Sequence, residues 1–226
     1  MLVGHLAVGL AAKRIEPKIS VGTLVLAAMF ADFLWCFFMI AGIEHVQIKQ
    51  GMGAANYIGA LSVPYSHSLL MIVGWVLLFA AAYSMRRNYS RGALVILIAV
   101  LSHWFLDFVA HPPDMPIAPG LQKVFGLGLW NSVPATLIIE GGFRLLAIIL
   151  YARATHPQKR IGTYAFWIVI ALLTLAWYNN IAGPPPKDPS HMGISSLIFF
   201  SLIVAWAYWM NRLRPLQMKS STLQSI

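Results

Sequence analysis

Long apolar stretches alternate with short polar segments along the whole chain. Six of these stretches approach the length of about 20 residues that a helix needs to cross a bilayer. They lie near residues 20–43, 67–85, 92–111, 133–152, 162–181 and 193–211. The pattern predicts an all-α fold, a polytopic membrane helix bundle of about six transmembrane helices in a single integral-membrane domain, residues 1–214. We expect residues 215–226, which are polar, to form a disordered cytoplasmic tail.

Residues 1–12 are apolar but too few to cross a membrane. Lys13 and Arg14 follow the apolar run, whereas a secretory signal carries its basic residues before it. We expect residues 2–15 to form a half-length helix that reaches from the cytoplasmic face toward the middle of the membrane. The alternative is an amphipathic helix on the membrane surface. Only the first arrangement brings His5 toward the other polar residues.

Composition supports the membrane assignment, because 59% of the residues are hydrophobic and only 10% are charged. Soluble domains carry about a quarter of charged residues. The basic residues also alternate between the loops. One set precedes the first stretch, follows the last, or lies in the second–third and fourth–fifth connections: Lys13, Arg14, Lys18, Arg86, Arg87, Arg91, Arg153, Lys159, Arg160, Arg212, Arg214 and Lys219. The other connections hold only Lys49, Lys123 and Lys187.

This asymmetry predicts that both termini are cytoplasmic, because positively charged loops stay on the cytoplasmic side. The expected location is a bacterial inner membrane. The net charge of +9 is explained by the topology, so it does not indicate nucleic-acid binding. Membrane lipid is the expected partner, and the sequence leaves the oligomeric state open.

The segment SHWFLDFVAHPPDMP, residues 102–116, carries the densest set of chemical groups. His103, Asp107 and His111 are spaced four residues apart, so on a helix their side chains share one face. A carboxylate at the centre of a membrane helix costs roughly 2.5–3.5 kcal/mol. A bound metal ion would compensate for that cost and would account for histidine and aspartate together. A proton or ion relay is the alternative for this set.

Other polar residues fall at the same predicted depth. Asp32, His67 and Glu140 lie in three other predicted spans, and all of them belong to the half of the membrane away from the cytoplasm. We therefore predict metal ligands among His5, Asp32, His67, His103, Asp107 and His111.

Imidazole and carboxylate ligands favour a divalent transition metal, foremost Zn²⁺, with Mn²⁺ and Fe²⁺ as alternatives. An uncoordinated carboxylate nearby, Glu140 or Asp114, is the candidate general base. Ser66, Ser68 and Ser102 could supply hydrogen bonds to the ligands. Two simpler interpretations stay open: Glu140 can form an ion pair with Arg144 one helical turn later, and His111 and Asp114 can be ordinary loop residues.

The arrangement resembles the predicted bacterial membrane-bound metal-dependent hydrolases of the LexA-regulated type. That family carries a GH near its start, then LPDxD, HRGxTHS and SHxxxD. The matching positions are His5 in VGHLAVG, Asp32 in MFADFLW, His67 in PYSHSLL, and His103 with Asp107 in SHWFLDF. LPDxD keeps one Asp here, and HRGxTHS is reduced to YSHS. The resemblance covers residues 1–115, and it implies a membrane hydrolase that depends on metal.

Two classes of function follow from these observations. The first is a membrane-embedded metal-dependent hydrolase that acts on a lipid-borne ester or phosphoester, through a site in the outer half of the bilayer. The second is a membrane protein without enzymatic activity, either a metal or proton conduit or a scaffold. Polar residues are scarce in the cytoplasmic halves of the predicted spans, which favours a one-sided pocket over a conduit.

Overall fold

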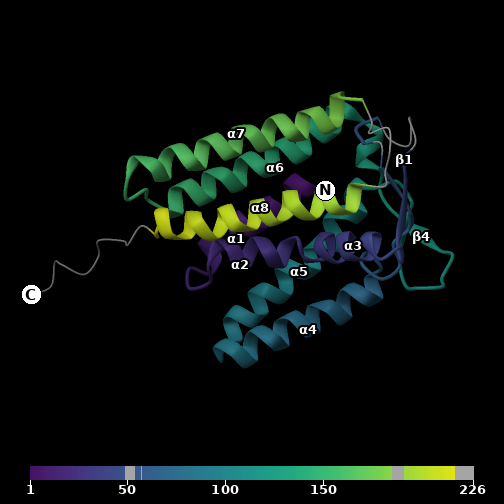
Figure 1. The fold of residues 1–226 in the computed structure, drawn as a ribbon, viewed down its shortest axis with the longest axis horizontal. Coiled ribbons are helices and arrows are strands. Elements are labelled where there is room, and N and C mark those ends of the chain that lie inside the picture. Colours follow the sequence, from purple (N-terminus) through teal and green to yellow (C-terminus); the bar gives the residue numbers. More distant parts are fainter. Residues whose placement is uncertain (49–53, 57, 185–190, 217–226) are drawn as a thin grey trace, which may run out of the picture.

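The structure, a computed structural model, describes residues 1–48, 54–56, 58–184 and 191–216. Most of the expected disordered tail, from residue 217 onward, lies outside these residues. The described chain is an all-α bundle with two short β-hairpins at one end (Figure 1). Its helices are α1 (Leu2–Ile15), α2 (Val21–Ala28), α3 (Phe30–Ile40), α4 (Leu69–Arg87), α5 (Ser90–Ala110), α6 (Val133–Ala154), α7 (Arg160–Ala182) and α8 (Met192–Leu213).

Helices α4 to α8 are each long and apolar enough to cross a membrane. They agree with five of the expected spans, so the predicted fold class, a polytopic membrane helix bundle, is confirmed. Their outward faces carry large apolar side chains such as Leu77, Ile98, Ile138 and Leu172, each more than half exposed. In a membrane protein these faces contact the lipid chains, which are apolar like the exposed side chains.

The first expected span is not one continuous helix, although α2 and α3 together are long and apolar enough to form a broken span or a re-entrant loop. Helices α2 and α3 meet at Met29 with a bend of 57°. Met29 has φ −101° and ψ 10°, outside helical geometry. The bend leaves the carbonyl of Ala28, at the end of α2, without a helical partner. That carbonyl instead accepts a hydrogen bond from the ring of His103.

Helix α1 lies inside the bundle, where it packs against α2, α5 and α6. The alternative of a surface helix is therefore wrong. Gly9 allows the close packing on α2, because a Cβ there would lie 2.7 Å from the Cα of Val25. The N-terminus of helix α1 lies within the bundle, and its last turn carries the basic residues Lys13 and Arg14. Met1 consequently lies buried within the bundle rather than at the face where the sequence analysis expected the N-terminus.

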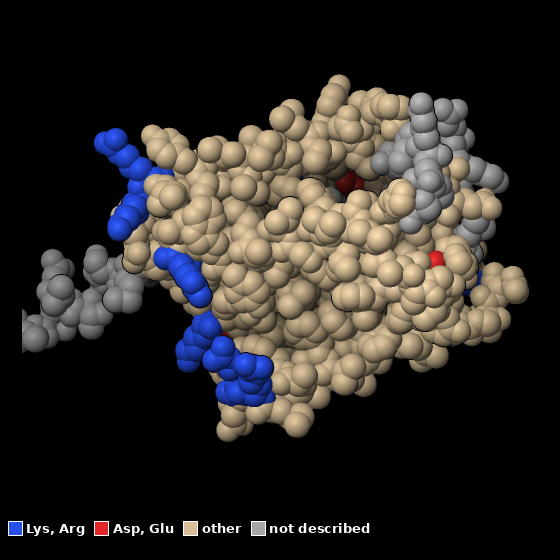
Figure 2. All heavy atoms as spheres, in the orientation of Figure 1, with Lys and Arg blue, Asp and Glu red and all other residues tan. Residues whose placement is uncertain are grey.

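The two ends of the bundle differ in charge and in structure. Figure 2 shows Lys and Arg side chains gathered at one end, where α4, α6 and α8 finish and α7 begins; we call it the basic end. The opposite end, the hairpin end, carries the antiparallel pairs β1 (His45–Ile48) with β2 (Ile58–Ser62), and β3 (Met115–Pro116) with β4 (Val124–Phe125). A short 3₁₀ helix, η1 (Leu129–Asn131), precedes α6 there.

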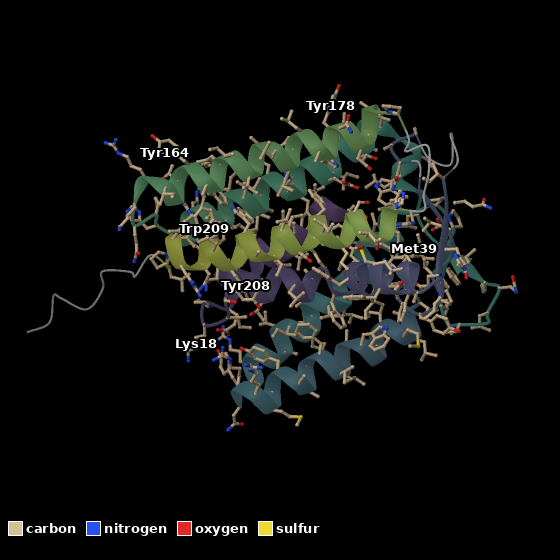
Figure 3. The ribbon with its side chains drawn as sticks, in the orientation of Figure 1. Lys18, Met39, Tyr164, Tyr178, Tyr208 and Trp209 are labelled. Carbon is tan, nitrogen blue, oxygen red and sulfur yellow. The ribbon has the colours of Figure 1, made fainter. Side chains whose placement is uncertain are left out.

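Aromatic side chains mark both ends of the apolar surface. Tyr164 and Trp209 lie toward the basic end and Tyr178 lies toward the hairpin end, all pointing outward (Figure 3). Tyrosine and tryptophan favour the headgroup level of a bilayer, because their rings are apolar and their tips are polar. Helix α7 is 23 residues long, which is enough to cross a membrane, as expected for an integral membrane protein.

Candidate metal centre

Asp107 of α5 is the centre of a buried polar cluster. Its Oδ1 lies 2.6 Å from the amino group of Met1 and 3.1 Å from Nε2 of His5. Its Oδ2 lies 3.1 Å from Nε2 of His103 and 3.7 Å from Nε2 of His67. Asp107 is 1% exposed, and His5 and His103 are fully buried. These contacts join α1, α5 and the turn before α4 at one point.

Two overlapping groups of side chains present ligand atoms to a common space. One group is His5, His103 and Asp107, and the other is Asp32, His67 and His103. In each group the candidate ligand atoms lie within 4.8 Å of one another. The structure thus brings together five of the six residues predicted as ligands, and these buried groups could hold a metal ion.

His67 and His103, which form a candidate ligand group with Asp32, have fixed ring orientations. Nδ1 of His103 lies 2.9 Å from the carbonyl oxygen of Ala28, which can only accept, so Nδ1 carries the proton and donates. Nδ1 of His67 lies 2.6 Å from Oγ of Ser66, whose own proton is donated to Glu44. His67 must therefore also donate through Nδ1. In both neutral rings Nε2 then keeps a lone pair.

These two Nε2 atoms face each other at 3.3 Å. Oδ1 of Asp32 lies 3.9 Å from each of them. The other oxygen of Asp32, Oδ2, is a buried atom without a hydrogen-bond partner among the described residues. Lone pairs and carboxylate oxygens repel one another at this range unless a metal ion or a shared proton lies between them. The donor set of two imidazoles and two carboxylates fits a divalent transition metal.

Glu44 helps to orient His67 through the hydroxyl of Ser66. Its Oε1 accepts hydrogen bonds from the backbone N–H groups of Tyr65 and Ser66, both at 2.8 Å. Its Oε2 accepts the Ser66 hydroxyl proton at 2.5 Å. Burial raises the pKa of Glu44, while these three hydrogen bonds favour its charged form. A chain from Glu44 through Ser66 therefore holds the His67 ring with Nε2 toward the cluster.

His111 and Asp114 lie beside the cluster rather than in it. Helix α5 ends at Ala110, and His111 has the extended backbone φ −70° and ψ 147°. Its N–H still forms the last helical hydrogen bond, to the carbonyl of Asp107, and His111 lines the same cavity as Asp107. Its Nδ1 lies 3.0 Å from Oδ1 of Asp114, and His111 belongs to neither candidate ligand group. Their predicted roles as ligand and base stay predictions.

Glu140 of α6 is 3% exposed and binds two tryptophans. The indole N–H of Trp130 donates to its Oε1 at 2.7 Å, and that of Trp177 donates to its Oε2 at 2.9 Å. Arg144 turns away and donates to the carbonyl of Ile170. The ion pair between Glu140 and Arg144 that the sequence left open is not formed between these two described side chains.

A cavity of about 460 Å³ joins Glu140 to the polar cluster. Its wall includes Met1, Asp32, His67 and Asp107, together with Glu140 of α6, Trp130 of η1 and Trp177 of α7. Residues near the hairpin ends of α7 and α8 complete the wall. Figure 2, viewed across the helices, shows a hollow between α7 and α8 with acidic atoms visible inside. The cavity thus opens toward the side of the bundle.

The sequence analysis missed several residues of this site. Glu44, Trp130 and Trp177 lie in a loop, in η1 and on an otherwise apolar helix, and no spacing pattern marks them. Of the three serines expected to assist the ligands, only Ser66 hydrogen-bonds a ligand. Ser68 caps α4 by accepting from the N–H of Met71, and Ser102 donates to the carbonyl of Ala99.

Comparison of the chain with known protein families, with curated proteins and with solved structures finds no match in any of the three.

Proposed function

We propose that this integral membrane protein is a metal-dependent hydrolase that acts on a lipid-borne ester or phosphoester. One observation carries the proposal: a buried cluster of histidine and aspartate side chains that could hold a metal ion lines a cavity with a lateral opening. The resemblance of residues 1–115 to the predicted membrane-bound metal-dependent hydrolases supports the same function.

The ligands we propose are His5, Asp32, His67, His103 and Asp107. A divalent ion held by such residues polarises an ester or phosphoester oxygen and activates water. Zn²⁺ is the first candidate, and Mn²⁺ and Fe²⁺ are the alternatives. Asp32 borders the cavity, and its Oδ2 without a partner is available to accept a proton from water. From the sequence we expect Glu140 or Asp114 to be the general base.

A lipid substrate is favoured by the position of the opening. The hollow between α7 and α8 faces sideways, where acyl chains lie in a membrane (Figure 2). The part of the cavity wall that α7 and α8 contribute includes apolar Met192 and Phe199 together with polar Asn180 and Ser195. A lipid can leave its chains outside and bring only its headgroup to the cluster. With the basic end in the cytoplasm, as the charge asymmetry favours, this headgroup would come from the outer leaflet of the inner membrane.

The packing argues against the conduit. Between His103 and the basic end, the described interior is filled by apolar side chains, among them Leu24, Ile72, Ile96 and Val100, each fully buried. A path for ions would need polar groups or water along this route. The cavity is therefore one-sided, as expected for a site that binds a substrate and releases products on the same side.

The hydrolysis test uses the full chain in mixed micelles of detergent and phospholipid, or of detergent and a lipid-linked phosphate. We expect release of product that stops with a chelator and returns when Zn²⁺ or Mn²⁺ is added. Asp107→Asn should abolish it, because the amide cannot balance the charge of the cluster. The variants Glu140→Gln and Asp114→Asn test whether either acid is the general base, because loss of a general base lowers the rate by about 10²-fold or more. Full activity of a folded Asp107→Asn variant would refute the proposal.

A further inference from the structure

Glu140 is a buried carboxylate that forms no ion pair among the residues that the structure describes, although the Met1 amino group lines the same cavity. Its hydrogen bonds come from two indole N–H groups, which are neutral donors. A carboxylate removed from water is stabilised by a cation or by charged donors far better than by neutral ones. The nearest basic residue along α6, Arg144, is bound to the backbone of α7 instead.

Aromatic rings lie close to this carboxylate. Trp130 and Trp177, which hold its two oxygens, also form part of the cavity wall. The ring faces of tryptophan attract organic cations, and the attraction grows when both partners are removed from water. Arg144 lies over one face of Trp177 and His111 packs against Trp130, so the parts of both rings that line the cavity, together with the carboxylate, are what an ammonium group would meet.

The other charged groups that line the cavity also favour a cationic occupant. The described wall of the cavity holds three carboxylates, those of Asp32, Asp107 and Glu140, and one ammonium group, that of Met1. The Met1 ammonium is engaged by Asp107 at 2.6 Å, and the metal that we propose would lie between Asp107 and Asp32. Glu140 keeps only neutral hydrogen-bond donors, so a cationic group of the occupant can pair with it.

We propose that Glu140, Trp130 and Trp177 form a subsite for the ammonium group of a phospholipid headgroup. This inference rests on the proposed function and narrows its substrate class. The substrate then carries a phosphoester, bound at the histidine–aspartate cluster, and a cationic amine, bound at Glu140. Zwitterionic phospholipids of the ethanolamine or choline type have both groups in one headgroup. Anionic phospholipids with a glycerol headgroup lack the amine.

The test measures lipid binding and hydrolysis separately. Native mass spectrometry of the purified chain in detergent, titrated with phosphatidylethanolamine, phosphatidylcholine or phosphatidylglycerol of identical acyl chains, gives the affinity for each. We expect the wild-type chain to bind one or both amine lipids about tenfold more tightly than phosphatidylglycerol. Comparison of ethanolamine with choline distinguishes a primary from a quaternary ammonium.

Glu140→Gln should reduce the preference to less than about threefold, because the amide keeps the size of the side chain but loses its charge. Trp177→Leu, which removes one ring face, should weaken the preference as well and serves if Glu140→Gln does not fold. The matched control is Glu16→Gln, since Glu16 is also buried but lies beside Arg91, at the basic end. It should keep the preference.

Equal binding of all three lipids by the wild-type chain would overturn this inference, as would an unchanged preference in a folded Glu140→Gln variant. The hydrolysis assay reports on the proposed function independently. If amine lipids bind preferentially but none is hydrolysed, the subsite stands and the hydrolase proposal fails. If phosphatidylglycerol is hydrolysed as well as the amine lipids and binds equally, the hydrolase stands and the subsite fails.

Discussion

His67 owes its orientation to two residues that do not touch the cluster centre. The hydroxyl of Ser66 accepts from its Nδ1 and donates to Glu44. The spacing of His103 and Asp107 on one helix was readable from the sequence, because a helix has a fixed period. The role of Glu44 was not, because it lies 22 residues from Ser66 and is brought there only by the loop that follows α3.

Ser66→Ala should weaken metal binding by about 10–100-fold, the usual cost of losing a group that orients a metal ligand. The affinity can be measured by competition with a chromophoric chelator. Ser68→Ala is the matched control, because Ser68 is equally buried but caps α4. It should cost about 1 kcal/mol of stability and leave the affinity unchanged. An equal loss of affinity in both variants would show that the turn, and not the hydroxyl of Ser66, determines the effect.

At the scale of elements, the site depends on two features of helix packing. Helix α1 carries His5 into the bundle, and the bend between α2 and α3 at Met29 frees the Ala28 carbonyl for His103. The sequence indicated the first, because residues 2–15 are apolar but too short to span. It did not indicate the second, because no proline or glycine stands at the bend and its position depends on packing.

Gly9→Ala should displace α1 from α2, because the added Cβ would lie 2.7 Å from the Cα of Val25. Small residues at helix contacts allow this close approach in membrane proteins. We expect a loss of about 1–3 kcal/mol of stability, measured by thermal unfolding in detergent, together with a lower metal content. Gly74→Ala on α4 is the control, because nothing lies within 4 Å of a Cβ there. If Gly9→Ala kept wild-type stability and metal content, the tight contact between α1 and α2 would not matter to the site.

In the molecule as a whole, the two ends of the bundle differ in charge. Basic side chains gather at one end and the acidic cavity lies toward the other (Figure 2). The alternation of lysine and arginine between the loops predicted this charge separation, because loop charge governs orientation in a membrane. The sequence could not predict the lateral hollow between α7 and α8, because it depends on how two apolar helices diverge near one end.

The central claim is that the histidine–aspartate cluster holds a divalent transition metal. The most direct test is elemental analysis of the full chain, purified in mild detergent without added chelator. We expect about one or two divalent ions per chain. We also expect their loss from the folded His103→Ala/Asp107→Ala variant. A wild-type chain free of transition metal, or a double variant with unchanged metal content, would contradict the claim.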